Sequence, residues 1–275
     1  MEFNDILVEN TDGVAIITLN RPAQLNSLMM ASIEELNQAL DTIEADDSIG
    51  VVVISGSPRP DGRPCFCAGL DLKEIAENGV PRLTRGGTNG AIEGLAVLGV
   101  IENPFMLLCD RLESFPKPTI AAIDGICTGG GLEIALCCDF RIVAETAKVS
   151  DLHLKNLGVI GGGGATVRLT HAVGPSKAKE IAFTGEPLSG EEAYRIGLAN
   201  KVVPSAELLA GAKDFAGKMV SISSSGLRLA KASIHATLNM NLRDALRYSY
   251  VCWAAALAEA DESAKKFAGR SGESK

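Results

Sequence analysis

The sequence predicts an α/β protein with a largely parallel sheet over residues 1–200, followed by a helical region over residues 201–275. In the first part, short apolar runs alternate with segments of helical periodicity, and glycines and prolines separate them. From Ser176 onward almost every segment carries an apolar stripe at helical spacing. Alternating strands and helices favour parallel pairing, because each crossover helix covers a face of the sheet.

The sequence clearly indicates two strands and a helix between them in the first part of the chain. Val14 to Leu19 is a run of strand-forming residues, and Val51 to Ile54 is a fully apolar strand. Between them, three- and four-residue steps between apolar residues predict an amphipathic helix with Ile33, Leu36, Leu40 and Ile43 on its buried face.

The middle of the chain continues the alternation. Asp71 opens a helical pattern, and residues 78–103 are glycine-rich and ambiguous. A helix resumes at Phe105 and ends at Pro116 to Pro118. Further segments are predicted in this order: a central strand from residue 120, a strand at 140–144, a connection at 151–159, and helices at 165–173, 178–183, 189–196, 208–220, 226–238 and 241–259.

Composition excludes several functions. The 275 residues are 46% hydrophobic, which is enough for a substantial core. A formal net charge of −8 argues against nucleic-acid and anionic-membrane surfaces as partners, and an anionic small ligand would need a local Lys/Arg patch. No metal site is expected, because Cys65-Phe-Cys67 lacks zinc-ligand spacing.

The seven cysteines are odd in number and several lie in apolar stretches, which favours reduced thiols. No segment is an uninterrupted apolar run long enough to cross a membrane, and the first residues lack the pattern of a secretory leader. The sequence therefore predicts a soluble, cytoplasmic protein.

The stretch from Ile120 to Asp139 indicates a site for chemistry. It is typical of a buried strand, a glycine turn at Gly129 to Gly131, and an apolar helix with Glu133 one turn in. Glycines let a ligand approach the backbone, and the N–H groups of a helix start favour an oxyanion. Glu133 then lies where it can move a proton. In the alternative, this helix only packs tightly on a sheet, and the negative charge of Glu133 stabilises the helix N-terminus.

A second glycine turn, Cys67-Ala-Gly-Leu-Asp71, follows the strand at Val51 to Ile54 and leads into a helix near Leu72. Loops after two parallel strands meet at one edge of a sheet. Two such turns can present two backbone N–H groups to a single oxygen.

Several ordered motifs together resemble the enoyl-CoA hydratase/isomerase (crotonase) superfamily over nearly the whole chain. They are Asn20-Arg-Pro with Asn26-Ser-Leu28, Phe66 to Leu72, Pro118 to Glu133, and Cys138 to Ala144, followed by residues 161–169, 178–185, 193–202 and a C-terminal Phe267-x-x-Arg270. The chain has no GxGxxG motif, so a dinucleotide-binding oxidoreductase lacks its phosphate fingerprint.

The resemblance implies a spiral of ββα units with a C-terminal helical trimerisation region, assembled as a homotrimer or homohexamer. It implies an acyl-CoA substrate whose thioester carbonyl accepts hydrogen bonds from the N–H groups of Leu70 and Gly130. No cofactor is implied, because coenzyme A enters as part of the substrate.

The same resemblance places the coenzyme A moiety near Gln24, Leu25 and Ala68, with Phe267 and Arg270 reaching its nucleotide from a C-terminal helix. It also shows that the segment around residues 76–107 is longer than in typical members, where this region lines the acyl pocket. Either a reshaped acyl pocket or a surface insertion accounts for the extra length.

In hydratases of this family two glutamates share a water. Glu133 matches the first, whereas His153 stands where the second is usual, with Asp151 as the nearest alternative. An imidazole can donate or accept a proton near neutral pH, so we expect His153 to partner Glu133. In the alternative, His153 only packs or hydrogen-bonds, and Glu133 works alone.

The leading hypothesis is hydration of a 2-enoyl-CoA through an enolate held in the oxyanion hole. An enoyl-CoA double-bond isomerase is the alternative within the family, since one carboxylate suffices to move a proton between two carbons. A non-catalytic acyl-CoA binding protein is the alternative from another class, and the presence of Glu133 argues against it.

Overall fold

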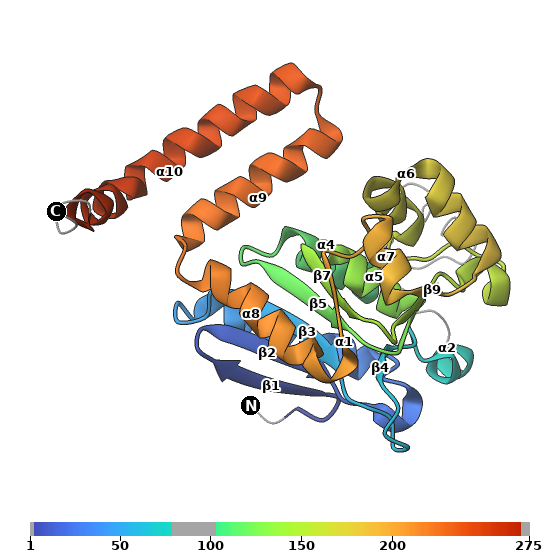
Figure 1. Cartoon of the computed structure of the whole chain (residues 1–275). Helices are drawn as coiled ribbons and strands as arrows, with labels where there is room; N and C mark the ends of the chain where they lie inside the picture. Colours follow the sequence, from blue (N-terminus) through green and yellow to red (C-terminus); the bar gives the residue numbers. More distant parts are fainter. Residues whose placement is uncertain (1–2, 79–102, 271–275) are drawn as a thin grey trace.

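The computed structural model describes residues 3–78 and 103–270, with side chains up to Leu257 except at 74, 75 and 78 (Figure 1). A six-stranded sheet forms its centre, in the order β1-β2-β3-β5-β7-β10. Only the β1–β2 pair is antiparallel. The six strands are β1 (Ile6–Thr11), β2 (Val14–Leu19), β3 (Val51–Gly56), β5 (Thr119–Ile123), β7 (Phe140–Ala144) and β10 (Lys201–Val203).

Apart from the exposed edge strand β1, both faces of this sheet are largely buried, and its side chains alternate between two apolar layers. In β3, Val51 and Val53 face helix α8 (Leu208–Val220), whereas Val52 and Ile54 face the larger core on the other side. That second face is covered by α1 (Met30–Ala45), whose apolar stripe includes the four residues predicted from spacing. The α/β class with a largely parallel sheet is confirmed.

A second sheet of short strands, in the order β4-β6-β8-β9, lies beside the first. Its strands are β4 (Cys65–Cys67), β6 (Ile126–Thr128), β8 (Lys148–Ser150) and β9 (Leu188–Ser189), and only the β8–β9 pair is antiparallel.

The two sheets are linked by a repeated ββα unit. In each unit one strand enters the large sheet, the next enters the small sheet, and a helix follows. The units are β3-β4-α2, β5-β6-α5 and β7-β8-α6, with helices α2 (Leu72–Asn78), α5 (Gly130–Cys137) and α6 (Ala165–Thr184). The predicted series of ββα units is therefore present.

The remaining elements are short helices and connections. They are η1 (Pro22–Gln24), α4 (Pro104–Ser114), the π-helix η2 (His153–Leu157), α7 (Gly190–Arg195) and η3 (Ser205–Glu207). Helix α6 joins two predicted helices, and Gly174 between them has a non-helical backbone with φ of 78°.

Two expectations about the glycine turns are wrong in detail. The turn at Cys67–Asp71 follows β4, not the strand at Val51–Ile54. Likewise, the turn at Gly129–Gly131 follows β6 and not the central strand β5. Strands of three residues carry too little pattern to be separated from neighbouring loops in the sequence.

The C-terminal part begins inside the α/β core. β10 completes the large sheet and α8 covers it, whereas α9 (Ser224–Asn239) and α10 (Leu242–Arg270) form a hairpin that extends away from the core (Figure 1). The domain boundary at residue 200 stays a prediction. Within the described residues, no helix has the length and apolarity needed to cross a membrane.

Candidate active site

Three neighbouring parallel strands of the small sheet end at the same edge. β4 is followed by residues 68–71, β6 by the glycine turn at 129–131, and β8 by residues 151–153. Carboxyl ends of adjacent parallel strands bring their loops together. A hydrogen bond between the hydroxyls of Ser150 and Thr128, 3.2 Å apart, ties the last residues of β8 and β6 to each other.

Two backbone N–H groups meet where the first two turns touch. The N–H of Leu28 donates to Gly69 and that of Asp71 donates to Leu28, so the N–H of Leu70 points away from Leu28. The place that a Cβ would take on Gly130 lies 3.4 Å from the nitrogen of Leu70. Gly130 opens α5, so its N–H has no acceptor within the helix. This geometry fits a shared oxyanion.

Glycine is required at both turns. Gly69 has φ of +105°, and a Cβ there would lie 2.9 Å from the nitrogen of Gly130. A Cβ on Gly131 would lie 2.3 Å from the carbonyl oxygen of Cys67, a contact with backbone that cannot be relieved by a rotamer change. The glycines therefore allow the first turn of α5 to lie directly on β4.

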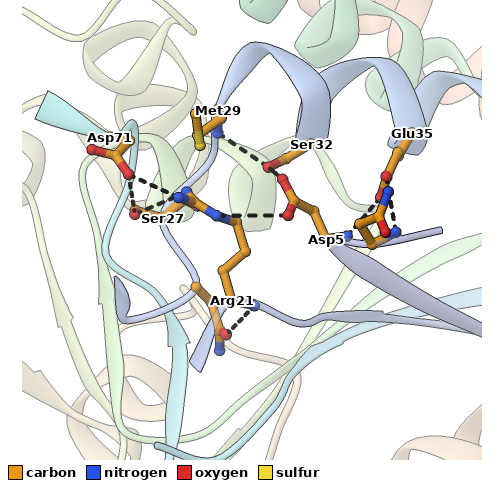
Figure 2. Close-up of polar contacts among 9 residues, drawn as sticks. Asp5, Arg21, Ser27, Met29, Ser32, Glu35 and Asp71 are labelled. Atoms are coloured by element: carbon orange, nitrogen blue, oxygen red, sulfur yellow. Dashed lines mark hydrogen bonds and ion pairs between the residues drawn. The ribbon is translucent and has the colours of Figure 1, made fainter. Parts of the chain in front are cut away.

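A largely buried arginine, Arg21, holds the Leu70 turn in place. The guanidinium of Arg21 lies between Asp5, 3.7 Å away, and Asp71, 3.1 Å away, and also donates to the carbonyl of Ser27 (Figure 2). Ser32 at the start of α1 donates to the other oxygen of Asp5 (Figure 2). This cluster, Asp5-Arg21-Ser27-Asp71, connects the N-terminal segment and the 20–28 connection to the residue beside Leu70.

Glu133 is the buried carboxylate of the site. It is 1% exposed, and its Oε1 accepts a hydrogen bond of 3.1 Å from the N–H of Ala165 at the start of α6. Burial raises the pKa of Glu133 above its ordinary value, although the neighbouring His153 and the N–H groups of Ala165 and Gly163 oppose that rise.

His153 faces Glu133 from the adjacent loop. Its Nε2 lies 3.7 Å from Oε2 of Glu133, and its Nδ1 lies 2.7 Å from Oδ1 of Asp151. Burial lowers the pKa of His153, but the hydrogen bond to Asp151 and the negative charges of Glu133 and Asp151 outweigh it, so the net pKa is raised.

The glycine run before α6 makes room for this pair. A Cβ on Gly161 would lie 2.3 Å from Oε1 of Glu133 and 2.7 Å from Cε1 of His153. A Cβ on Gly163 would lie 2.9 Å from Cδ of Glu133. Backbone at these positions thus packs directly on both titratable side chains, and it excludes water from that side.

The pair opens into a cavity of about 690 Å³. Its walls include the two N–H turns and a group of apolar side chains, Phe105, Met106, Leu157, Val159 and Ile160. Such a cavity holds a ligand of cofactor size with an apolar tail.

The predicted binding residues divide into two groups. Gln24, Leu25 and Ala68 line this cavity, and the N–H of Ala68 donates to the carbonyl of Leu25 over 3.0 Å. Phe267 and Arg270 lie in the last turns of α10, outside the residues whose side chains are described. Most of the longer 76–107 segment, residues 79–102, also lies outside the described residues.

Two roles, those of Lys73 and Asp151, were not predicted from the sequence. Lys73, on α2, is the one Lys or Arg among the described residues that line the cavity, so it is the candidate partner for an anionic part of the ligand. Asp151 contacts His153 rather than replacing it. The Asp-x-His spacing is the sequence signal by which this role of Asp151 could have been identified. In residues 3–78 and 103–270 no three His, Cys, Asp or Glu side chains are grouped to hold a metal ion.

Comparison with known proteins decides the family. The sequence profile of the enoyl-CoA hydratase/isomerase family matches residues 9–272. The chain belongs to this family. Family membership confirms the resemblance seen in the motifs, and it identifies the ββα units as the crotonase fold.

Individual relatives are similar over most of their length. A short-chain-enoyl-CoA hydratase of Clostridium acetobutylicum is 35% identical over 248 residues, covering 90% of this chain and 87% of the relative. A probable enoyl-CoA hydratase of Mycobacterium bovis is 35% identical over 96% of this chain and 93% of its own length. The crystal structure of an enoyl-CoA hydratase from Bacillus anthracis superposes with a TM-score of 0.82 at 34% identity, covering 98% of this chain and 97% of that structure. This member of the enoyl-CoA hydratase/isomerase family is thus matched along both its core and its C-terminal helices.

Proposed function

We propose that this enzyme adds water to the double bond of a 2-enoyl-CoA thioester. The observation that carries the proposal is the position of Glu133 and His153 beside two converging N–H groups in one cavity. The names of the relatives, which are hydratases, support the same reaction.

The thioester carbonyl oxygen binds between the N–H groups of Leu70 and Gly130. Addition at carbon 3 places negative charge on this oxygen, because the intermediate is an enolate. Fixed N–H donors aimed at such an oxygen contribute on the order of 10²–10³ in rate each.

The water binds between Glu133 and His153. Their facing atoms are 3.7 Å apart, too far for a direct hydrogen bond, and one water oxygen at about 2.8 Å from each satisfies both. The water oxygen bonds to carbon 3, and its proton passes to the carboxylate of Glu133. The imidazolium of His153 then gives a proton to carbon 2, which yields the 3-hydroxyacyl-CoA.

The lining of the cavity suits both parts of such a substrate. The coenzyme A moiety lies along Gln24, Leu25 and Ala68, with Lys73 facing its anionic groups, and the acyl group lies along Phe105 and the other apolar side chains of the wall. We propose no resident cofactor or metal, because proton transfers and the oxyanion hole suffice for hydration. We also propose a homotrimer or homohexamer, with α9 and α10 at the subunit contacts.

Double-bond isomerisation is the competing activity, and the replacement of a second glutamate by His153 favours it. In that reaction Glu133 removes a proton from one carbon of the substrate and returns it to another, and no water is added. Tight binding of acyl-CoA esters without turnover is the third possibility.

Mass spectrometry of products formed in heavy-oxygen water separates these activities. A panel of straight-chain, branched and cyclic 2-enoyl-CoA esters is incubated with the wild type and Glu133→Gln. We expect heavy oxygen in a 3-hydroxyacyl-CoA, and a loss of at least about 10³-fold in kcat for Glu133→Gln. Asp214→Asn, an exposed carboxylate change on α8, is the control and should retain wild-type turnover.

Recovery of an ester of unchanged mass with a displaced double bond would establish the isomerase instead. Binding of every ester without a product would establish the non-catalytic protein. Both outcomes overturn the proposed hydration.

A further inference from the structure

Asp151 is a buried carboxylate to which the proposed reaction assigns no step. It is 1% exposed and lies between β8 and η2, directly after the residue that bonds to Thr128. Its Oδ1 accepts two hydrogen bonds from the same residue, one from Nδ1 of His153 at 2.7 Å and one from the His153 backbone N–H at 3.1 Å.

These contacts fix both the tautomer and the direction of the imidazole. A carboxylate only accepts hydrogen bonds, so Nδ1 of His153 carries a proton. In the neutral ring Nε2 is then the acceptor, and in the imidazolium it is the donor. The backbone bond holds the loop, and the ring bond turns Nε2 toward Oε2 of Glu133.

We propose that Asp151 is a positioning residue that keeps Nε2 of His153 aimed at the reacting water and makes His153, rather than Glu133, the acid of the site. This inference rests on the proposed hydration. Asp151 does not contact the cavity among the described lining residues, so it acts through His153.

The charges around His153 support this assignment. Among the described residues, the ionisable groups that face its ring are Asp151 on the same loop and Glu133 on α5, and both are acidic. Gly161 is also packed on the ring, where an added Cβ would lie 2.7 Å from Cε1 of His153, and it brings no charge. Two carboxylates therefore stabilise the imidazolium, and its proton is retained to higher pH than in a free histidine.

The kinetic test is the pH profile of hydration by Asp151→Asn. The active form requires an ionised Glu133 and a protonated His153, so activity falls at high pH as the imidazolium loses its proton. Removal of the Asp151 charge lowers the pKa of His153, so this high-pH limb moves to lower pH by about one unit. We expect kcat to fall about 10²- to 10⁴-fold with little change in KM, because an asparagine permits the wrong tautomer.

Nitrogen NMR of histidine-labelled protein tests the inference without turnover. The chain has three histidines, so His153 is assigned by the signal that disappears in His153→Gln. The wild type should show a protonated Nδ1 in the neutral ring and a midpoint above that of an ordinary imidazole. In Asp151→Asn the midpoint should fall by about one unit.

Glu186→Gln is the matched control. Glu186 is an exposed carboxylate paired with Lys155 on η2, the element that begins with His153, and it does not contact the ring. It should change neither the midpoint nor the high-pH limb. Circular dichroism and a thermal melt establish that Asp151→Asn is folded.

A His153 midpoint and a high-pH limb that are unaltered in folded Asp151→Asn would overturn the inference. A neutral ring protonated on Nε2 in the wild type would do so as well. If the wild type hydrates no ester, the proposed function fails, and the imidazole midpoints still decide the role of Asp151.

Discussion

At the scale of residues, the site places the carboxylate of Glu133 opposite the imidazole of His153, and the surroundings raise the pKa of both groups. Burial raises the pKa of Glu133, and the two neighbouring carboxylates raise that of His153. Both shifts favour the protonated form, because burial disfavours the charged carboxylate and the neighbouring carboxylates favour the charged imidazole. A water between them can lose one proton to Glu133 while His153 supplies another.

Gly161→Ala tests how closely this pair must be held. Its Cβ would lie 2.3 Å from Glu133 and 2.7 Å from His153, so one of the two side chains must move. Displacement of a reacting group by about 1 Å costs on the order of 10²-fold in kcat. We expect a loss of this size by steady-state kinetics.

Gly162→Ala is the control, since its Cβ would meet only the flexible end of Met106 at 3.4 Å. It should retain most of the wild-type kcat. Equal losses in the two variants would show that the glycine run matters for the loop and not for the fit against Glu133 and His153.

At the scale of elements, the site depends on where three short strands end. β4, β6 and β8 run parallel in one small sheet, and each is followed by one part of the site. The Asp5-Arg21-Ser27-Asp71 cluster connects the first of these turns to β1, β2 and α1 (Figure 2).

Arg21→Met tests this connection. It removes the guanidinium that lies beside Asp5 and Asp71, both largely buried, and breaking a buried ion pair from one side costs about 3–5 kcal/mol. Urea unfolding should show a decrease at the lower end of that range, and kcat should fall because the N–H of Leu70 loses its support.

Arg63→Met is the comparison variant, because Arg63 is 67% exposed and pairs with Asp61 at the surface. Its effect on the free energy of unfolding should be far smaller than that of Arg21→Met, because water screens an exposed ion pair. Similar losses for the two arginines would contradict a specific role for the cluster.

The sequence predicts the parts of the site that glycine and acidic residues mark. Gly69 and Gly129 to Gly131 are recognisable because positive φ and close backbone contacts require glycine. The small sheet could not be predicted, because its strands have two or three residues each. The role of Asp151 was also missed, since only the fold turns its side chain back onto Nδ1 of His153.

At the scale of the whole molecule, the α9–α10 hairpin extends away from the core (Figure 1). Many of its apolar side chains are exposed. The exposed large ones on these helices are Ile234, Leu238, Leu242, Leu246, Tyr248, Tyr250, Val251, Trp253 and Leu257. Apolar surface of this extent is typical of a contact with another chain. The proposed trimer or hexamer would cover it.

Trp253, the one tryptophan of the chain, reports on this contact. It is 64% exposed in the single chain. If α10 lies in a subunit interface, the fluorescence of Trp253 should be blue-shifted in the assembled protein. On dilution the emission should shift to the red as the measured mass falls toward the 28.7 kDa of one chain. An emission typical of a solvated indole at all concentrations, together with the mass of one chain, would contradict the proposed assembly.

A double-mutant cycle on hydration tests most directly the claim that Glu133 and His153 act on one water. kcat is measured for the wild type, Glu133→Gln, His153→Ala and the double variant. Residues that act as a unit are strongly non-additive, so the double variant should be no more than about tenfold slower than the slower single variant. Losses that multiply in full, or a His153→Ala enzyme as fast as the wild type, would show that Glu133 works without its imidazole partner.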